Sequence, residues 1–300
     1  MVDERKARRE RQRRRIRRRR TLAGGALSLV VAVVIAFVVS SSGNSDRGRG
    51  SSPVANQTAT RSQVGRPTSV AVRNATPQPD WRPYTGPVPI LEYHVLGAAP
   101  ASEPYPDLYV SRPDFHRQMS WLDENGYEAV TLEQVEAAWY HGARLPPKPV
   151  VISFDDGYRP QYTYALPELR RHGWAGVLNL KAEGSDLYPS NVEAMIAAGW
   201  ELAAHTIHHL DLTELDAAQL KEEVAGSRKI LEREYGVPVK NFCYPAGRFD
   251  TTVIDAAEAA GYVGATTEIH GYADRGHPYE LDRFEILGSA GLAGMVADLR

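Results

Sequence analysis

Residues 150–157 read Val-Val-Ile-Ser-Phe-Asp-Asp-Gly and indicate the fold more clearly than any other part of the chain. Residues 150–154 form a continuous apolar run between turn signals. A run of this length predicts a strand that is buried on both faces, as strands are in a parallel sheet. Two carboxylates and a glycine follow directly, so the buried strand ends in a polar turn.

Strand and helix patterns alternate on both sides of this stretch. The expected strands cover residues 88–93, 150–154, 176–180, 200–204, 241–244, 262–266 and 283–287. The expected helices cover residues 113–125, 131–142, 161–172, a short stretch from 190, 216–235 and 251–260. Repeated βα units indicate a parallel sheet. About seven of them in one α/β domain predict a complete or distorted (β/α) barrel.

Charge is distributed unevenly along the chain. Residues 1–20 contain 12 Lys or Arg against 3 Asp or Glu, whereas residues 84–300 contain 17 against 32. An acidic main domain argues against nucleic acid as a partner, because phosphate binding needs a basic face. The chain has one cysteine, Cys243, which excludes an intrachain disulfide and a cysteine-based zinc cluster.

The N-terminal part predicts a membrane anchor. Residues 22–39 are 18 residues without a charge, and they follow an arginine-rich tail. As a helix they span roughly 27 Å, and basic residues beside such a span stay in the cytoplasm. We expect a cytoplasmic basic tail over 1–20, a single transmembrane helix over 21–39, a disordered linker over 40–83, and an extracytoplasmic domain over 84–300 at the cell membrane. A cleaved signal peptide is the alternative, although the apolar run exceeds the usual signal length of about 7–15 residues.

Polar residues gather directly after the predicted strands. They are His94 after 88–93, Asp155 and Asp156 after 150–154, His205 and His209 after 200–204, and residues 244–247, Tyr-Pro-Ala-Gly, after 241–243. The chemistry of a βα barrel lies at the carboxyl ends of its strands. One barrel mouth would therefore bring these segments together.

His205 and His209 have the spacing of metal ligands. They are four residues apart, so one helical turn would place both imidazoles on one side, where zinc, iron, nickel or cobalt could bind. His208 points away from that side and is the weaker candidate. Two close carboxylates, Asp155 and Asp156, also call for a nearby cation. Taken alone, however, Asp-Asp-Gly is ordinary turn chemistry.

Residues 244–247 suggest an unusual turn. Proline has no N–H and glycine permits left-handed backbone, so the Ala246 N–H could point into the mouth as an oxyanion donor. By themselves these four residues are better explained as a tight βα turn.

Together these elements resemble the polysaccharide deacetylases, which are carbohydrate esterases with the NodB-homology fold. The resemblance covers roughly residues 87–290 and rests on 153–157, 205–209 and 242–247. It implies that Asp155 is the catalytic base. It also implies that Asp156, His205 and His209 hold one divalent metal ion, zinc foremost, with cobalt or nickel as alternatives. The resemblance places Tyr244, Pro245 and Ala246 at the groove wall.

The sequence departs from the family pattern at two positions. Cys243 stands where the family's third motif has an arginine that orients the base, and either Arg248 or Arg283 could substitute. Residues 286–288, Ile-Leu-Gly, lack the histidine of the usual late motif, which supplies the general acid. Some members that resemble poly-N-acetylglucosamine deacetylases use a histidine after the first strand instead, and His94 matches that variant. A structural role for His94 is the alternative, with the loop residues His270 and His277 as the next candidates for the acid.

Together with the anchor predicted from the N-terminal residues, the resemblance implies a membrane-anchored enzyme that hydrolyses N-acetyl groups of a cell-envelope or extracellular polysaccharide with the help of a metal ion. A non-catalytic, membrane-tethered glycan-binding module with a vestigial site is the rival interpretation. A glycoside hydrolase using Asp155 and Asp156 fits badly, because its two carboxyls must flank the bond about 5–9.5 Å apart. Peptidoglycan, chitin-like chains and poly-N-acetylglucosamine all remain candidate substrates.

Overall fold

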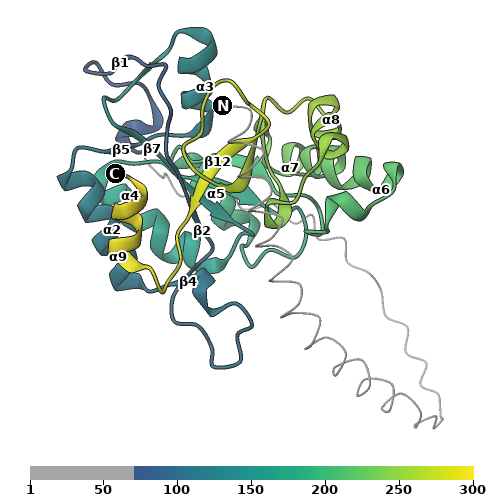
Figure 1. The fold of residues 1–300 in the computed structure, drawn as a ribbon, viewed down its shortest axis with the longest axis horizontal. Coiled ribbons are helices and arrows are strands. Elements are labelled where there is room, and N and C mark those ends of the chain that lie inside the picture. The colour runs from purple at the N-terminus through teal and green to yellow at the C-terminus, as the bar shows by residue number, and fades with distance from the viewer. Residues whose placement is uncertain (1–70) are drawn as a thin grey trace, which may run out of the picture. The chain divides into compact units, whose positions relative to one another are not determined.

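The structure, a computed structural model, describes residues 71–300. Seven parallel strands close into a ring (Figure 1). They are β2 (Ile90–Tyr93), β7 (Pro149–Asp155), β8 (Val177–Leu180), β9 (Glu201–Ala204), β10 (Asn241–Cys243), β11 (Gly264–His270) and β12 (Leu281–Glu285). Each strand pairs with the next in this order, and β12 pairs back with β2. The predicted distorted (β/α) barrel is confirmed.

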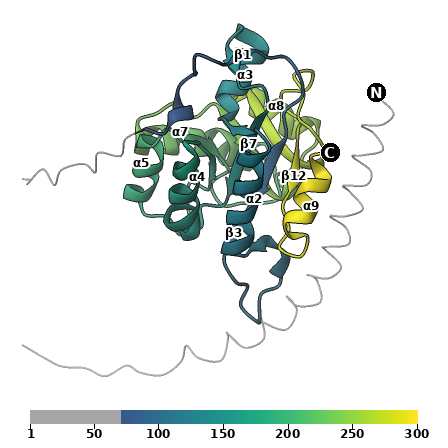
Figure 2. The ribbon, with the colours of Figure 1, turned by 90° about the vertical axis from the view of Figure 1, so that its left-hand side faces the viewer.

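Helices cover the outside of the ring (Figure 2). They are α2 (Arg112–Glu124), α3 (Leu132–His141), α4 (Leu166–His172), α5 (Pro189–Ala197), α6 (Ala217–Lys221), α7 (Ser227–Tyr235), α8 (Thr251–Ala259) and α9 (Gly291–Asp298). The single helix expected over 216–235 is divided between α6 and α7 by a π-helical turn at Glu222–Gly226. The sequence patterns did not predict α9.

Short strands lie outside the ring. They are β1 (Arg82–Pro83), β3 (Val95–Leu96), β4 (Tyr109–Val110), β5 (Glu128–Ala129) and β6 (Arg144–Leu145). β5 extends the sheet beyond β7, whereas β1 pairs with β6 and β3 pairs with β4. β1 and α3 lie at one end of the barrel, and β3 and β4 lie at the other, where the ring strands end (Figures 1 and 2).

The helix α3 shows how local sequence sets an element's limits. The Thr131 hydroxyl accepts from the Gln134 N–H, and the Gln134 side chain accepts from the Thr131 N–H, so the predicted capping box is present. At the other end Gly142 adopts φ 72°, a left-handed conformation that glycine reaches without a steric penalty.

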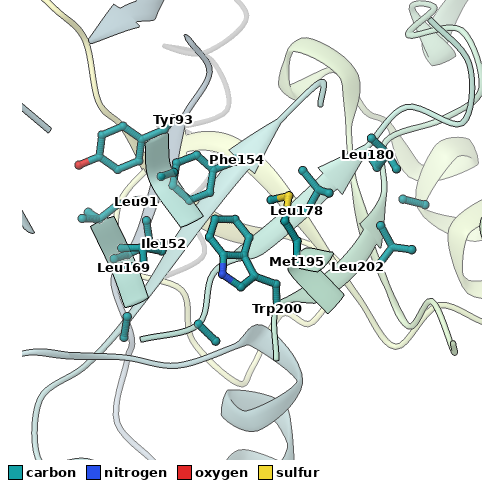
Figure 3. Packing of buried hydrophobic residues seen from close by; sticks show 14 of the residues in the cluster. Leu91, Tyr93, Ile152, Phe154, Leu169, Leu178, Leu180, Met195, Trp200 and Leu202 are labelled. Carbon is teal, nitrogen blue, oxygen red and sulfur yellow. The ribbon is translucent and has the colours of Figure 1, made fainter. Parts of the chain in front are cut away.

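Side chains alternate along β7 between two environments. Ile152 and Phe154 point outward into the apolar layer beneath the helices, where the Phe154 ring stacks on Trp200 at 5.2 Å and on Tyr93 at 5.7 Å (Figure 3). Asp155 bonds instead to residues of β10 and β12, which are not neighbours of β7 in the ring. Its side chain therefore lies inside the barrel, which is polar towards the carboxyl ends of the strands.

The folded domain begins earlier than the sequence suggested. Trp81 is fully buried in an apolar cluster at the β1 end of the barrel, and the buried Asn74 donates from Nδ2 to the Ala129 carbonyl at 3.0 Å. The predicted disordered linker over 40–83 is therefore wrong for residues 71–83, because burial of the large apolar Trp81 ties this segment to the barrel. The remainder of that linker, the basic tail over 1–20 and the transmembrane helix over 21–39 lie outside the described residues. Among the described helices, none is long and apolar enough to span a bilayer.

A buried acidic cluster lies at the amino ends of β9 and β10. The Asn241 Nδ2 donates to Glu201 at 2.9 Å and to Glu136 of α3 at 3.1 Å. Burial raises the pKa of Glu201 to about 8, with Glu133 and Glu136 adding to the effect. Burial likewise raises the pKa of Glu136 to about 7. Both carboxyls therefore keep a proton in the folded state at pH values where an unfolded chain has lost it.

This cluster predicts a pH-dependent stability. An unfolded glutamate ionises near pH ~4.3, so these two groups favour the folded state fully below that pH and lose the contribution as pH rises towards 8. Glu136→Gln mimics the protonated form, and its melting temperature should rise relative to the native chain between pH 5 and pH 8.5. The exposed Glu124→Gln is the control and should show no such change. Identical pH dependence in the Glu136→Gln and native proteins would contradict the assignment.

Candidate active site

The residues singled out by the sequence meet at the carboxyl ends of the ring strands. Asp155 ends β7 and Asp156 follows it, His94 follows β2, and His205 follows β9. Three overlapping groups of side chains bring ligand atoms within 4.8 Å of one another: Asp156 with His205 and His209, Asp155 with His205 and Cys243, and Asp155 with Glu92 and His94. One connected site thus combines four segments of the chain, around residues 92–94, 155–156, 205–209 and 243.

Asp156, His205 and His209 form a compact donor set. The Nε2 atoms of His205 and His209 lie 3.8 and 3.7 Å from the same carboxylate oxygen, Oδ1 of Asp156. The two imidazole rings are 4.8 Å apart at an angle of 70°. His205 and Asp156 are buried and His209 is partly exposed, so the group has one open side.

The protonation states of this group suit a cation. His205 Nδ1–H donates to the Cys243 carbonyl at 2.8 Å, which leaves the Nε2 lone pair directed at Asp156. Burial and the neighbouring His209 lower the pKa of His205 to about 4, so the imidazole is neutral. Burial of Asp156 opposes its ionisation, but the nearby histidines and Lys181 outweigh it and lower its pKa. Two neutral imidazoles and one carboxylate fit a divalent metal ion.

The backbone reaches this geometry by a route that the sequence did not predict. Residues 205–209 form an irregular loop and not the expected helical turn. Thr206 and His209 have φ values of 64° and 60°, and the Thr206 hydroxyl accepts from the His209 N–H at 2.8 Å. Asp156 and Ala246 also have positive φ, and no further non-glycine residue in the described part of the chain does. Such conformations cost about 1–3 kcal/mol each, and here they gather at the site.

His208 takes no part in the group, as the sequence suggested. Its Nδ1 lies 2.5 Å from Glu223, and its Nε2 lies 3.4 Å from Glu183. The Glu223 carboxylate also accepts the backbone N–H groups of Ile207 and His208. Glu223 therefore anchors the loop from the side opposite to the donor set.

Arg283, not Arg248, holds Asp155. The guanidinium donates from Nη1 to Oδ1 and from Nη2 to Oδ2 of Asp155, each at 2.9 Å, and both side chains are buried. Arg248 instead binds Asp211 at 2.7 Å. Burial would raise the pKa of Asp155, but Arg283 outweighs it and holds that pKa well below its usual range. Asp155 is therefore ionised and fixed in orientation.

Cys243 lies beside this pair and contacts both members. Its Sγ lies 3.4 Å from the Asp155 carboxylate and 3.3 Å from Arg283 Nη2. The guanidinium thus reaches Asp155 from β12, which is separated in the ring from the Cys243 strand β10 by β11. This explains how the chain keeps an arginine on Asp155 although the sequence has cysteine at the motif position.

His94 lies beside Asp155, whereas the alternative histidines do not share its surroundings. Gln161 Nε2 donates to the backbone carbonyls of His94, at 2.9 Å, and of Asp155, at 2.6 Å, and so joins the two segments. His270 pairs with Asp298 of α9 at 3.1 Å. His277 lies in a turn in which its N–H donates to the Asp274 carbonyl.

The third motif is only partly placed as expected. Ala246 has φ 50° and is partly exposed, and the hydrogen bonds that close its turn run from the N–H groups of Gly247 and Arg248. The groove-wall prediction is wrong for Tyr244, which is fully buried and donates its hydroxyl to the Tyr279 carbonyl at 3.1 Å. Pro245 is buried as well. Both residues support the turn from behind, because the strand direction points the tyrosine into the apolar layer.

Other side chains of the site were missed by the sequence analysis. Asn179 of β8 donates to Asp155 Oδ1 at 2.7 Å, and Lys181 Nζ lies 3.6 Å from Asp156 Oδ1. Lys181 follows β8 directly, so the rule that selected the other strand ends would have found it. Glu92 lies in β2 two residues before His94, which follows the strand, and alternation along this extended segment predicts that both side chains share a face.

Comparisons with known proteins agree with this geometry. The family model described as polysaccharide deacetylase matches residues 142–265. The candidate polysaccharide deacetylase YxkH of Bacillus subtilis (strain 168) is 32% identical over 213 residues, which cover 69% of this chain and 73% of that protein. The poly-beta-1,6-N-acetyl-D-glucosamine N-deacetylase of Escherichia coli (strain K12) is 45% identical over 60 residues, which are 20% of this chain and 9% of that protein.

A solved structure shows the same fold. The deacetylase PplD of Streptococcus pyogenes, in complex with acetate, has a TM-score of 0.67 over 72% of this chain and 100% of that chain, at 22% identity. Barrel, site and matches together define a carbohydrate deacetylase, a hydrolase of carbon–nitrogen bonds other than peptide bonds. The chain belongs to the polysaccharide deacetylase family.

The donor set gives a direct prediction for metal binding. His205→Ala removes one of three protein ligands, so zinc retained after gel filtration should fall from about one ion per chain to about one tenth or less. His208→Ala is the matched control, because His208 faces Glu223, and it should retain zinc like the native chain. Metal analysis of the eluted proteins measures both. Stoichiometric zinc in His205→Ala would exclude this donor set.

Proposed function

We propose that this protein hydrolyses N-acetyl groups of a polysaccharide of the cell envelope or the extracellular space, with one divalent metal ion, zinc foremost, held by Asp156, His205 and His209. The observation that carries the proposal is the ionised, arginine-clamped Asp155 directly beside this donor set. A binding module with a vestigial site would need neither a fixed base nor neutral imidazoles next to a carboxylate. Relatives that are named as deacetylases of poly-N-acetylglucosamine and of peptidoglycan support both glycans as substrates.

Asp155 acts as the general base. Its carboxylate is ionised and held by two hydrogen bonds from Arg283, so it can take a proton from a water molecule placed between it and the acetyl carbon. A bound metal ion supplies Lewis-acid chemistry, because it polarises the acetyl carbonyl and lowers the pKa of water. Asn179 and Arg283 keep the base from turning away as it becomes neutral.

His94 acts as the general acid. The amine of an N-acetyl sugar leaves poorly unless its nitrogen is protonated, so a second proton-transfer group is chemically required. His94 stands next to Asp155 with its side chain 11% exposed, which allows contact with a substrate at the mouth. The Ala246 N–H, on a strained and partly exposed turn, is the proposed donor to the developing oxyanion.

The proposed setting is the outer face of a membrane. The arginine-rich residues 1–20 and the uncharged residues 22–39 support a single anchor with a cytoplasmic N-terminus. A tether over residues 40–70 would then let the domain reach a polymer outside the cell. Protease added to intact cells should digest the domain, and protection that is lost on lysis would reverse this orientation.

The division of labour between Asp155 and His94 can be measured. Asp155→Asn should abolish acetate release from N-acetylated oligosaccharides and from activated acetate esters alike, while the protein keeps its zinc. His94→Ala should lower amide cleavage by about 10²–10⁴-fold and activated ester cleavage much less, because a good leaving group needs no proton.

Acetate assays across a panel of chitin-like, peptidoglycan and poly-N-acetylglucosamine fragments measure these effects and identify the substrate. An equal loss on amide and ester in His94→Ala would exclude His94 as the acid. Turnover of N-acetylated glycans by Asp155→Asn would exclude Asp155 as the base.

A further inference from the structure

Glu92 is a buried carboxyl group that the mechanism above does not use. It lies on β2 with 0% of its surface exposed, and within residues 71–300 neither of its carboxyl oxygens has a hydrogen-bond partner. Buried polar atoms are normally hydrogen-bonded, so an orphaned carboxyl group next to a catalytic site calls for a functional explanation.

Two groups lie close to the carboxyl group of Glu92. Its Oε1 is 3.8 Å from His94 Nε2, and its Oε2 is 3.3 Å from Arg283 Nη2. Glu92 and His94 are two residues apart on one extended segment, so both side chains face the inside of the barrel. Arg283 is already engaged, since it donates to both oxygens of Asp155 and from Nε to the Thr267 carbonyl. His94 is thus the one neighbour with an uncommitted nitrogen facing Glu92.

The surroundings favour a proton on Glu92. Burial raises its pKa well above the usual range, and the positive charge of Arg283 opposes this only in part. The acidic groups that face it are Asp155 of β7, Glu268 of β11 and Glu285 of β12, and each raises that pKa further. A proton held at Oε1 would point at the imidazole of His94.

We propose that Glu92 and His94 form one acid, a pair that holds a single transferable proton for the leaving amine, with Glu92 as the positioning residue of His94. The proposal rests on the proposed function. Because Nε2 faces Glu92, Nδ1 is the ring nitrogen that remains for the substrate. A small rotation of the ring would bring the 3.8 Å separation into hydrogen-bond range.

The proton transfer balances without another reactant. As the bond from the acetyl carbon to nitrogen breaks, its electron pair goes to nitrogen, which takes the Nδ1 proton of His94. The Oε1 proton of Glu92 moves to Nε2, so that Glu92 becomes a carboxylate and His94 a neutral imidazole with its proton on the other nitrogen. Starting instead from a Glu92 carboxylate and a His94 imidazolium leads to the same products. The pair therefore offers a proton over a wider pH range than a single imidazole does.

The test compares three variants on N-acetylated oligosaccharides and on an activated acetate ester. Glu92→Gln keeps the shape of the side chain but can neither give a proton nor become negative. Its rate of amide cleavage should fall by about 10-fold or more, with little change in its rate of ester cleavage. The alkaline limb of its kcat/KM profile should move to lower pH, because the variant lacks the proton that Glu92 contributes to the pair.

Two further variants separate this role from a structural one. Glu136→Gln removes a buried carboxyl at the amino ends of the strands, away from the site, and should leave the amide-to-ester ratio and the alkaline limb unchanged. Glu92→Asp keeps a carboxylic acid. Relative to Glu92→Gln, it should recover part of the rate of amide cleavage and move the alkaline limb part of the way back to its native pH. Melting temperature and bound zinc report the fold of every variant.

The outcomes are distinct. Failure of the native protein to release acetate from any N-acetylated glycan would overturn the proposed function itself. If the native protein deacetylates and Glu92→Gln has the native amide-to-ester ratio and alkaline limb, only the pairing of Glu92 with His94 is overturned. If Glu92→Gln fails to fold, the kcat/KM pH profile of Glu92→Asp decides. A positioning role requires that Glu92→Asp has a lower amide-to-ester ratio than the native protein and an alkaline limb at lower pH.

Discussion

Arg283 is the only Lys or Arg among residues 71–300 that is buried, and the catalytic end of the barrel depends on its ion pairs. From β12 it reaches Asp155 of β7 and Glu92 of β2, so one cation joins three strands of the ring. Burial of charge is expensive unless each ion has close partners, and removal of one partner typically costs about 3–5 kcal/mol. The polar interior therefore depends on a positive charge at this position. Its position also fixes Asp155, the proposed base, because a bidentate pair leaves the carboxylate one orientation.

The candidate metal site, formed by Asp156, His205 and His209, depends on the backbone rather than on buried charge. Asp156, Thr206 and His209 hold left-handed conformations that side chains normally avoid. Their strain is offset by hydrogen bonds that the loop makes elsewhere, such as those from Ile207 and His208 to the Glu223 carboxylate. The result is two imidazole nitrogens that face one carboxylate oxygen. Such preorganisation lowers the free-energy cost of assembling the site when a metal ion binds.

The sequence predicted what depends on local pattern and missed what depends on contacts across the ring. Strand ends located Asp155, Asp156, His205 and His209, because parallel strands bring their carboxyl ends together. The choice between Arg248 and Arg283 stayed open, since it depends on which strand faces Asp155 across the barrel. Burial of Tyr244 was missed for a similar reason, because a turn motif does not show which layer its aromatic ring enters. Glu92 went unnoticed inside an apolar strand, although its spacing from His94 was a usable signal.

The central claim is that Arg283 orients Asp155 for catalysis, and Arg283→Lys tests it most directly. Lysine keeps a positive charge near Asp155 and Glu92 but cannot donate two parallel hydrogen bonds to one carboxylate. The account predicts a folded protein that binds zinc like the native chain and releases acetate from N-acetylated oligosaccharides at least about 10-fold more slowly. Arg283→Lys that deacetylates at the native rate would show that the charge alone suffices, and would contradict the claim that orientation of the base by Arg283 controls the reaction.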